Sequence, residues 1–245
     1  MLLELDHISK TYGDLRAVDD LNLTVPEGEW LAIVGSSGSG KTTLMNMIGC
    51  MDTPSKGSVK LEGRKLEDLN ATQLADVRKN LIGLVFQKFY LVPHLTAVEN
   101  VMVAQYYHSV VDEKQAMEAL EKVGLKDQAY KRADALSGGQ MQRVGICRAL
   151  IQEPKLLLAD EPIASLDPKS AEIVMEQMHD ITSERGLTCI VNLHQVDFAR
   201  RYASRIVGIR DGQVVFDGAP DELTEEMTAF IYQGKEHEMK LKESG

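Results

Sequence analysis

The stretch GSSGSGKTT at residues 35–43 lies between the apolar run WLAIV at 30–34 and the segment LMNMI at 44–48. A continuous apolar run is typical of a strand that is buried on both faces of a parallel sheet. The segment that follows the glycines predicts a helix, so the order is that of a phosphate-binding P-loop. The pattern G-x4-G-K-[ST] should occur by chance on the order of 0.01 times in a chain of this length, which makes an ordinary glycine-rich turn a weak alternative.

The loop has the chemistry to bind the phosphates of a nucleotide. Its glycines let successive backbone N–H groups turn toward the β-phosphate, and the following helix adds the positive end of its dipole. We expect Lys41 to reach the β- and γ-phosphates and the Thr42 hydroxyl to coordinate Mg²⁺. The expected phosphate-binding residues are Gly35, Ser36, Ser37, Gly38, Ser39, Gly40, Lys41, Thr42 and Thr43.

Composition excludes several other classes of protein. The chain has 245 residues with 27 Lys+Arg against 37 Asp+Glu, and its net charge of −10 argues against nucleic-acid binding and against electrostatic attachment to anionic lipid. No uncharged apolar run reaches the roughly 18 residues that a membrane span needs, and acidic residues come too early for a signal peptide. We therefore expect a cytoplasmic protein with no direct membrane insertion. Its 3 cysteines are widely spaced, which argues against a disulfide framework or a zinc site.

Further strands and helices place the P-loop in an α/β core. Apolar runs at 155–159 and 187–191 predict two more buried strands. Alternating apolar and polar residues at 2–12 and 17–25 predict a small sheet with an exposed face. The segment 112–123 has helical periodicity, which indicates a separate helical lobe in the middle of the chain.

The end of the chain carries two weaker signals. Residues 207–216 predict a hairpin, because the Asp211-Gly212 pair suits a turn with positive φ. The last twelve residues, GKEHEMKLKESG, are charged and predict a frayed tail.

Two carboxylates follow the predicted strand at 155–159. Asp160 and Glu161 lie where ligands bind in open α/β sheets, at the C-terminal end of a strand. Strand alternation would point them in different directions, so we expect Asp160 to help hold Mg²⁺ and Glu161 to polarise the attacking water as a general base. For the pair alone, solvated turn residues would be the better interpretation, but the P-loop favours the catalytic one.

The segment ALSGGQMQR at 135–143 is the most specific motif in the chain. Ser-Gly-Gly before a helix that is predicted to begin at Gln140 indicates a second anion-binding helix terminus, formed by Ser137, Gly138, Gly139 and Gln140. In this motif the chain resembles the ATPase subunits of ATP-binding-cassette (ABC) transporters, whose signature is LSGGQ. The resemblance extends from about residue 2 to about residue 224.

The resemblance implies a fold and a mode of assembly. The fold is an α/β P-loop NTPase (ABC ATPase) core with an N-terminal antiparallel β subdomain and an inserted α-helical subdomain. A single ABC ATPase domain would span 1–224, with the helical subdomain at about 88–150 and a charged C-terminal tail at 225–245. Two copies would close head to tail around two ATP molecules with Mg²⁺, each ATP lying between the P-loop of one copy and the LSGGQ of the other.

Four further site residues follow from the resemblance alone. Tyr12 stands where the family stacks an aromatic ring on adenine, and Gln87 matches the glutamine that touches Mg²⁺ and the attacking water. Asp167 belongs to the loop that crosses the dimer, and His194 matches the histidine that contacts the γ-phosphate. Taken singly, Tyr12 would be a packing tyrosine, Gln87 a loop glutamine and His194 a structural histidine. Met141 and Cys147 depart from the commoner Gln and Ala of the signature helix, at positions that do not touch phosphate.

The resemblance leaves the cargo open. The first half, with FQKFYLVPHLTAVENV at 86–101, resembles the lipoprotein-release and macrolide-exporter branch, whereas DEPIASLDP at 160–168 and LHQVDFARRY at 193–202 resemble phosphonate importers. We favour the importer, because its matching strings are rarer, with export or extraction as the alternative. The implied partners are integral membrane permease subunits, which would hold this chain on the cytoplasmic face of the membrane, and, for an importer, a substrate-binding protein. A soluble, non-transport ABC ATPase is disfavoured, since 245 residues leave no room for a long coiled-coil insertion or a second cassette.

We predict that Lys41→Ala weakens nucleotide binding itself, because the variant loses the charge-assisted hydrogen bonds to the phosphates. The measurement is a titration with labelled ATP. Wild-type affinity in this variant would contradict the P-loop assignment.

Overall fold

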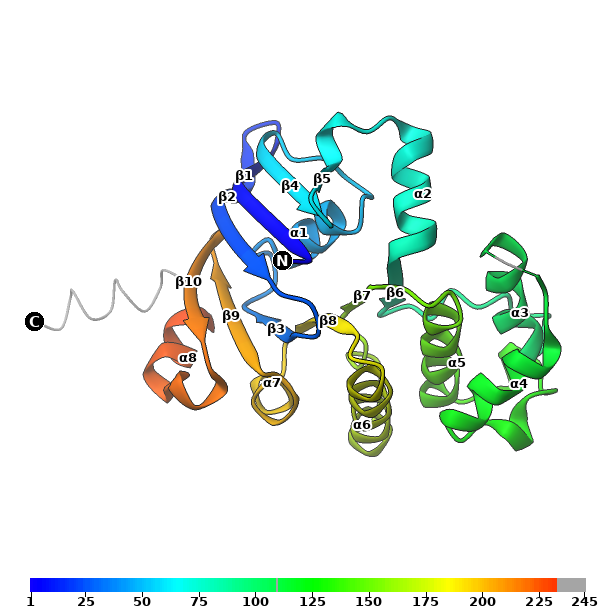
Figure 1. Cartoon of the computed structure of the whole chain (residues 1–245). Coiled ribbons are helices and arrows are strands. Elements are labelled where there is room, and N and C mark those ends of the chain that lie inside the picture. Colours follow the sequence, from blue (N-terminus) through cyan, green and yellow to red (C-terminus); the bar gives the residue numbers. More distant parts are fainter. Residues whose placement is uncertain (109, 233–245) are drawn as a thin grey trace, which may run out of the picture. The chain divides into compact units, whose positions relative to one another are not determined.

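Contacts along the chain divide it into two units, and the computed structural model describes residues 1–108 and 110–232 (Figure 1). The first unit contains Met1–Val25, Trp30–Glu67 and the chain from Asn192 onward, and the second contains Pro26–Glu29 and Asp68–Val191. The P-loop belongs to the first unit and the LSGGQ segment to the second, so the two predicted phosphate-binding helix starts lie in different units.

An antiparallel sheet in the first unit confirms the alternating pattern at the start of the chain. Its strand order is β2-β1-β4-β5. The bounds are β1 Leu3–Tyr12, β2 Leu15–Val25, β4 Lys56–Leu61 and β5 Arg64–Lys65. Leu3, Leu5 and Ile8 of β1 are buried. The interval between successive buried residues changes from two positions to three at His7, which adopts a φ of 48°. The irregular residue keeps the apolar side chains on the same face of the sheet.

The remaining strands of the first unit lead into the P-loop. β3 (Trp30–Val34) is buried along its whole length and pairs in parallel with β9 (Arg205–Arg210), which pairs antiparallel with β10 (Gln213–Gly218). The predicted buried strand and the predicted hairpin are therefore confirmed. Asp211 and Gly212 take the positive φ values, 50° and 80°, that the short turn requires.

Within the described residues, the first unit has three α-helices: α1 Lys41–Ile48, α7 Val196–Tyr202 and α8 Glu225–Tyr232. Helix α8 departs from the predicted tail at 225–245, of which residues 233–245 lie outside the described residues. The segment is helical because its last turn packs on the core. Ile231 is 1% exposed, and the Arg210 guanidinium lies 4.4 Å from the centre of the Phe230 ring.

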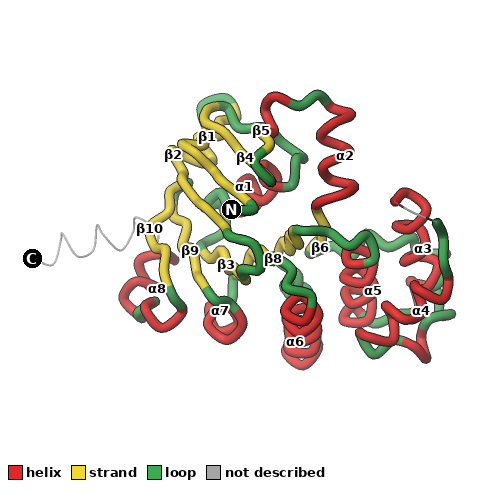
Figure 2. Tube along the Cα trace, viewed as in Figure 1, coloured by secondary structure: helices red, strands yellow, loops and turns green. Residues whose placement is uncertain are grey.

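Most of the α-helices that the structure describes belong to the second unit, and Figure 2 draws the helices in red. Its strands are β6 Ile82–Phe86, β7 Leu156–Asp160 and the first four residues of β8 Thr188–Leu193, in the order β8-β7-β6. Its α-helices are α2 Ala71–Leu81, α3 Ala97–His108, α4 Glu113–Lys122, α5 Gly138–Leu150 and α6 Pro168–Glu184. The predicted helix at 112–123 is α4, whose N-cap Asp112 accepts hydrogen bonds from the backbone N–H groups of Lys114 and Gln115.

The inserted helical subdomain at about 88–150 stays a prediction. Helices α3, α4 and α5 lie within that stretch, but the unit that contains them also includes β6, β7 and α6. In the part of the chain that the structure describes, every helix is too short or too polar to span a bilayer.

Arg205 ties the two sheets of the first unit together, and we predict that Arg205→Lys lowers the free energy of unfolding by about 1–2 kcal/mol. Its guanidinium bonds both carboxylate oxygens of Asp217, at 2.5 and 2.7 Å, and donates to the Thr24 carbonyl at 2.9 Å. A lysine keeps the positive charge but cannot donate to both carboxylate oxygens in this planar, two-bond geometry. Urea unfolding measures the change.

The matched control is Arg132→Lys, whose pair with Asp134 is local and exposed. We expect a change of less than about 0.5 kcal/mol there. An Arg205→Lys variant as stable as this control would contradict the prediction.

Candidate functional site

The P-loop joins β3 to the start of α1. Ser39 N–H donates to the Ser36 carbonyl at 3.2 Å, and the first helical bond runs from Leu44 N–H to Gly40 O at 2.9 Å. Helix α1 has no side-chain cap and no acidic residue in its first turn. Because the first N–H groups of a helix have no acceptor within it, this terminus has the form of an anion site.

Lys41 lies buried inside this loop. Its side chain is 4% exposed, and Nζ donates to the carbonyls of Gly35 and Ser36, each at 2.8 Å. A buried ammonium needs such acceptors to offset its lost hydration. The geometry places the cation among the backbone groups that were expected to surround phosphate.

Two loop glycines are required by neighbouring backbone. A Cβ on Gly35 would lie 2.2 Å from the Ile209 carbonyl oxygen, and one on Gly40 would lie 2.2 Å from that of Ala17. The sequence explained these glycines by the approach of phosphate. In the tertiary structure the loop also packs against the backbone of Ile209 and Ala17, which leaves no room for a side chain at Gly35 or Gly40.

Tyr12 also lies near the P-loop. Its hydroxyl donates to Asp52 Oδ2 at 2.6 Å, and Lys10 Nζ lies 5.0 Å from the ring centre. The bond to Asp52 raises the pKa of Tyr12, while a side-chain interaction with Thr43 lowers it. Burial would raise the pKa of Asp52, but hydrogen bonds from Lys10 and Tyr12 outweigh burial and lower it. The ring is therefore anchored by its hydroxyl, and the side chain remains 47% exposed.

His194 directly follows β8 and belongs to the same unit as the P-loop. Its backbone carbonyl accepts a hydrogen bond from the Tyr232 hydroxyl at 2.9 Å. The sequence did not single out Tyr232. One sequence signal could have indicated a packed helix here: Met227, Phe230 and Ile231 are apolar residues at helical spacing, whereas the residues after them are mostly charged.

In the second unit, Ser137 caps α5. Its Oγ accepts from Gln140 N–H at 3.3 Å, and Gln140 Oε1 accepts from Ser137 N–H at 2.9 Å. This capping box starts the helix at Gly138, two residues before the predicted start at Gln140. The first turn of α5 contains no acidic side chain.

The two glycines of LSGGQ lie against the loop and helix that follow β7. A Cβ on Gly139 would lie 2.9 Å from Ser170 Cβ, and one on Gly138 would lie 3.3 Å from Leu166 Cδ2. Asp167 accepts from Ser170 N–H at 3.1 Å as the N-cap of α6, and hydrogen bonds from Ser170 lower its pKa. The structure thus brings Gly139 and the loop of Asp167 together.

Gln87 and the acidic pair lie at one end of neighbouring strands. β6 and β7 are parallel, and Phe86 pairs with Asp160. Gln87 and Glu161 therefore both come directly after strand ends at the same edge of the sheet. β7 ends at Asp160, and Glu161 has a φ of 50°. The strand alternation predicted for this pair therefore does not extend to Glu161. A positive φ lies in the left-handed region of backbone conformation, where a non-glycine residue is strained. Strained residues of this kind are common at functional sites.

Side chains of α5 hold the segment after β6, and the sequence did not identify them. Gln142 is 1% exposed, and its Nε2 donates to Phe86 O at 3.1 Å. Arg148 donates to Phe89 O at 3.0 Å and to Tyr90 O at 2.6 Å. Burial lowers the pKa of Arg148. The LSGGQ helix and the Gln87 segment are therefore joined by hydrogen bonds within one unit.

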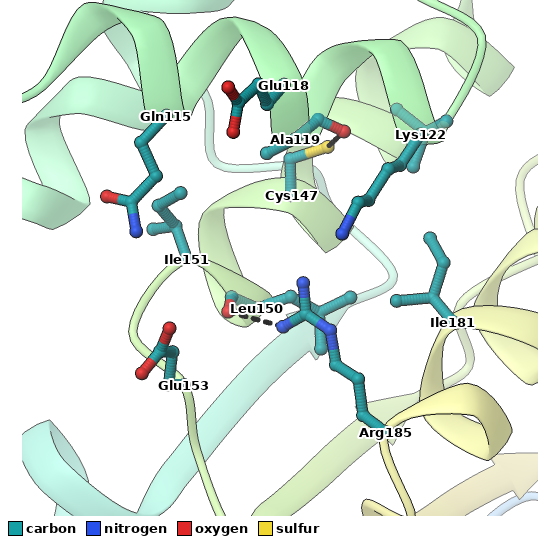
Figure 3. A pocket seen from close by; sticks show the side chains of 11 residues that line it. Gln115, Glu118, Ala119, Lys122, Cys147, Leu150, Ile151, Glu153, Ile181 and Arg185 are labelled. Carbon is teal, nitrogen blue, oxygen red and sulfur yellow. Dashed lines mark hydrogen bonds between the residues drawn. The ribbon is translucent and has the colours of Figure 1, made fainter.

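A separate cavity of about 170 Å³ lies beside the last turns of α5 (Figure 3). The Cys147 thiol donates to Ala119 O at 3.2 Å, and Arg185 donates to Leu150 O at 3.2 Å. Burial raises the pKa of Cys147 to about 12, so the thiol stays protonated at neutral pH. Neither LSGGQ nor Gln87 nor the acidic pair lines this cavity.

Comparisons with known proteins identify the family. A family model described as ABC transporter matches residues 18–164. The phosphonates import ATP-binding protein PhnC 2 of Oceanobacillus iheyensis is 44% identical over 97% of this chain and 98% of its own length. The chain belongs to the ABC transporter family.

Further relatives agree with this membership. PhnC of Treponema denticola is 41% identical, with 93% of each chain covered. A dimeric ATP-binding cassette in a post-hydrolysis state, bound to ADP and Pi, has a TM-score of 0.81 at 38% identity over 89% of this chain and 98% of that one. CbiO1 of Clostridium perfringens, part of the ABC transporter complex cbiONQ, has a TM-score of 0.83 at 27% identity over 94% and 93%.

These matches confirm the family and the fold class that were predicted. This ABC protein is an ATP-binding ATPase subunit with a mixed α/β P-loop fold. The roles of the individual site residues stay predictions, as do the domain boundaries.

We predict that Gly139→Ala lowers the free energy of unfolding by about 1–3 kcal/mol, because the added methyl group displaces the start of α5 from Ser170. Adding Ser170→Gly to this variant removes the opposing Cβ. A double-mutant cycle by urea unfolding should then show a favourable coupling between the two substitutions. Simple additivity would contradict the contact.

Proposed function

We propose that the chain is the ATPase of a phosphonate-type importer. In this proposal two copies close head to tail around two ATP molecules with Mg²⁺, and hydrolysis drives a membrane permease. The observation that carries the proposal is the match to phosphonate import proteins along nearly the whole chain. This match covers the first half of the chain as well, which in its short motifs resembles exporters.

ATP binding is assigned to the first unit. The start of α1 and the loop amides would take the phosphates, and Lys41 would exchange its bonds to Gly35 and Ser36 for bonds to them. The exposed ring of Tyr12 would stack on adenine, and its anchored hydroxyl limits the orientations the ring can adopt.

The donor set fits Mg²⁺. Thr42, Gln87 and Asp160 offer hydroxyl, amide and carboxylate oxygens, the hard ligands that this ion prefers. Among the described residues there is no cluster of three or more His, Cys, Asp or Glu side chains that could cage a metal alone. This agrees with an ion that is held partly by substrate phosphates. When bound, Mg²⁺ would neutralise charge on the β- and γ-phosphates.

Hydrolysis is assigned to Glu161, Gln87 and His194. Glu161 would accept the proton of the attacking water, and Gln87 would orient that water. His194 would contact the γ-phosphate. The strained backbone of Glu161 and its position beside the Gln87 segment support these roles.

Dimer closure is assigned to the LSGGQ helix start and the Asp167 loop. Ser137, Gly138, Gly139 and Gln140 would face the γ-phosphate of the ATP bound by the other copy. The close approach of Gly138 to Leu166 and of Gly139 to Ser170 supports a single surface at which signature and loop meet the partner copy together.

A groove in the second unit supports docking to a permease. It has a volume of about 490 Å³ and is lined by residues of α2, β6, α3 and α5, including Phe86, Tyr107 and Arg148. Tyr90, Tyr106 and Tyr107 are 63%, 73% and 69% exposed, an unusual density of exposed aromatic rings. Aromatic and arginine side chains are enriched in protein interfaces. A helix of a permease subunit would place the ATPase on the cytoplasmic face of the membrane, with a substrate-binding protein supplying cargo from the other side.

We predict that Glu161→Gln leaves ATP binding intact and slows hydrolysis by about 10²–10⁴-fold, because the amide cannot accept the proton. ATP should then hold the variant as a dimer, which light scattering detects. Unchanged turnover would remove Glu161 from the general-base role.

The same variant tests the cargo in cells. Replacing the wild-type chain with Glu161→Gln should abolish uptake of a labelled alkylphosphonate, and Tyr130→Phe serves as the control variant. Normal phosphonate uptake with impaired hydrolysis would reject phosphonate import while leaving the ATPase assignment intact.

A further inference from the structure

Tyr232 is the last described residue of α8, and its hydroxyl reaches the backbone of His194. The bond from its hydroxyl to His194 O measures 2.9 Å. Burial raises the pKa of Tyr232, and a bond with the Gly35 backbone lowers it. One hydroxyl group therefore meets the residue after β8 and the first residue of the P-loop, all within the first unit.

Helix α8 is held firmly enough for this bond to fix the position of His194. Arg200 of α7 donates to Glu225 at 3.0 Å, to Leu223 O at 2.8 Å and to Thr228 at 3.3 Å. At the other end of α8, Arg210 of β9 donates to Phe230 O at 3.1 Å and stacks on the Phe230 ring. These contacts fix the helix along its length against α7 and β9 (Figure 1).

Gly208 allows the last turn of α8 to approach the sheet closely. A Cβ on Gly208 would lie 2.5 Å from Ile231 Cδ1, so Ile231 occupies the place where a larger residue would extend. Ile231 immediately precedes Tyr232. Its packing sets the depth at which the tyrosine ring enters the unit.

We propose that Tyr232 is a positioning residue for His194, fixing the backbone of this residue so that its imidazole meets the γ-phosphate. The inference rests on the proposed role of His194. Tyr232 does not touch the reacting atoms in this scheme and acts only through the carbonyl group it binds. Because α8 carries the tyrosine, the C-terminal helix becomes a structural support of the hydrolytic site.

The test is the steady-state ATPase activity of the full chain carrying Tyr232→Phe, which keeps the ring and removes the hydroxyl group. We expect kcat to fall roughly 10-fold with KM changed less than about 2-fold, since positioning affects the reacting geometry more than ground-state binding. Tyr130→Phe is the matched control, because it loses a hydroxyl hydrogen bond of the same 2.9 Å length to Glu113 on the exposed surface. A raised KM with normal kcat would place the effect at the P-loop and overturn the proposal.

A double-mutant cycle separates this inference from the function on which it rests. In a His194→Ala background, Tyr232→Phe should cause no further loss, whereas an undiminished loss would overturn the proposal. Wild-type turnover in His194→Ala alone would instead reject the assigned role of His194. Impaired His194→Ala with normal Tyr232→Phe would overturn only the positioning role.

Hydrogen exchange gives a readout that does not depend on turnover. In Tyr232→Phe, we expect faster exchange of the backbone amides at 192–197 and unchanged exchange in the second unit. Unchanged exchange at 192–197 would overturn the proposal.

Discussion

Backbone N–H groups at the start of a helix are the interaction on which this ATPase depends. A triphosphate carries more negative charge than a single lysine can balance, and helix termini supply oriented donors without burying further charge. The chain presents two such termini, at α1 and α5, and neither has an acidic residue in its first turn. They differ in one respect: Gly40 provides no side-chain cap for α1, whereas Ser137 and Gln140 cap α5 reciprocally. In the proposed function, the first terminus surrounds phosphate with backbone, and the second presents a preorganised edge to a partner copy.

Close packing around these termini restricts the sequence more than phosphate binding alone would. Gly35 and Gly40 are contacted by the carbonyls of Ile209 and Ala17, and Gly139 is contacted by Ser170. The signature glycines therefore serve two purposes in the proposed mechanism, since they leave room for phosphate on one side and join α5 to α6 on the other. This packing would also let the Asp167 loop and LSGGQ act as one surface in the proposed dimer closure.

The residues expected to act in catalysis are held by others to which the sequence analysis assigned no role. Gln142 and Arg148 bond the backbone around Gln87, and Tyr232 bonds the backbone of His194. All three act on carbonyl oxygens, which every residue type possesses. Sequence motifs identify the groups that perform chemistry. A side chain that donates a hydrogen bond to a carbonyl far away in the sequence belongs to no motif of fixed spacing, so the sequence does not reveal it. Helix α8 was missed for a related reason. Its early residues include the polar Glu225, Glu226 and Thr228, and its apolar last turn gains stability by packing on Gly208 and Arg210.

The sequence by itself determined the α/β class, the buried strands, the P-loop and the ABC family, because each depends on contiguous residues with local physical requirements. Apolar runs predict buried strands, glycines with lysine predict a phosphate loop, and the LSGGQ string is rare enough to indicate one family. Only the tertiary structure decided that β7 ends at Asp160 with Glu161 in the left-handed region, that Asp52 and Thr43 interact with Tyr12, and that Tyr232 reaches His194. These features depend on pairs of groups 31 to 40 positions apart in the numbering or on a strained backbone, and neither property is encoded in the local pattern of side chains.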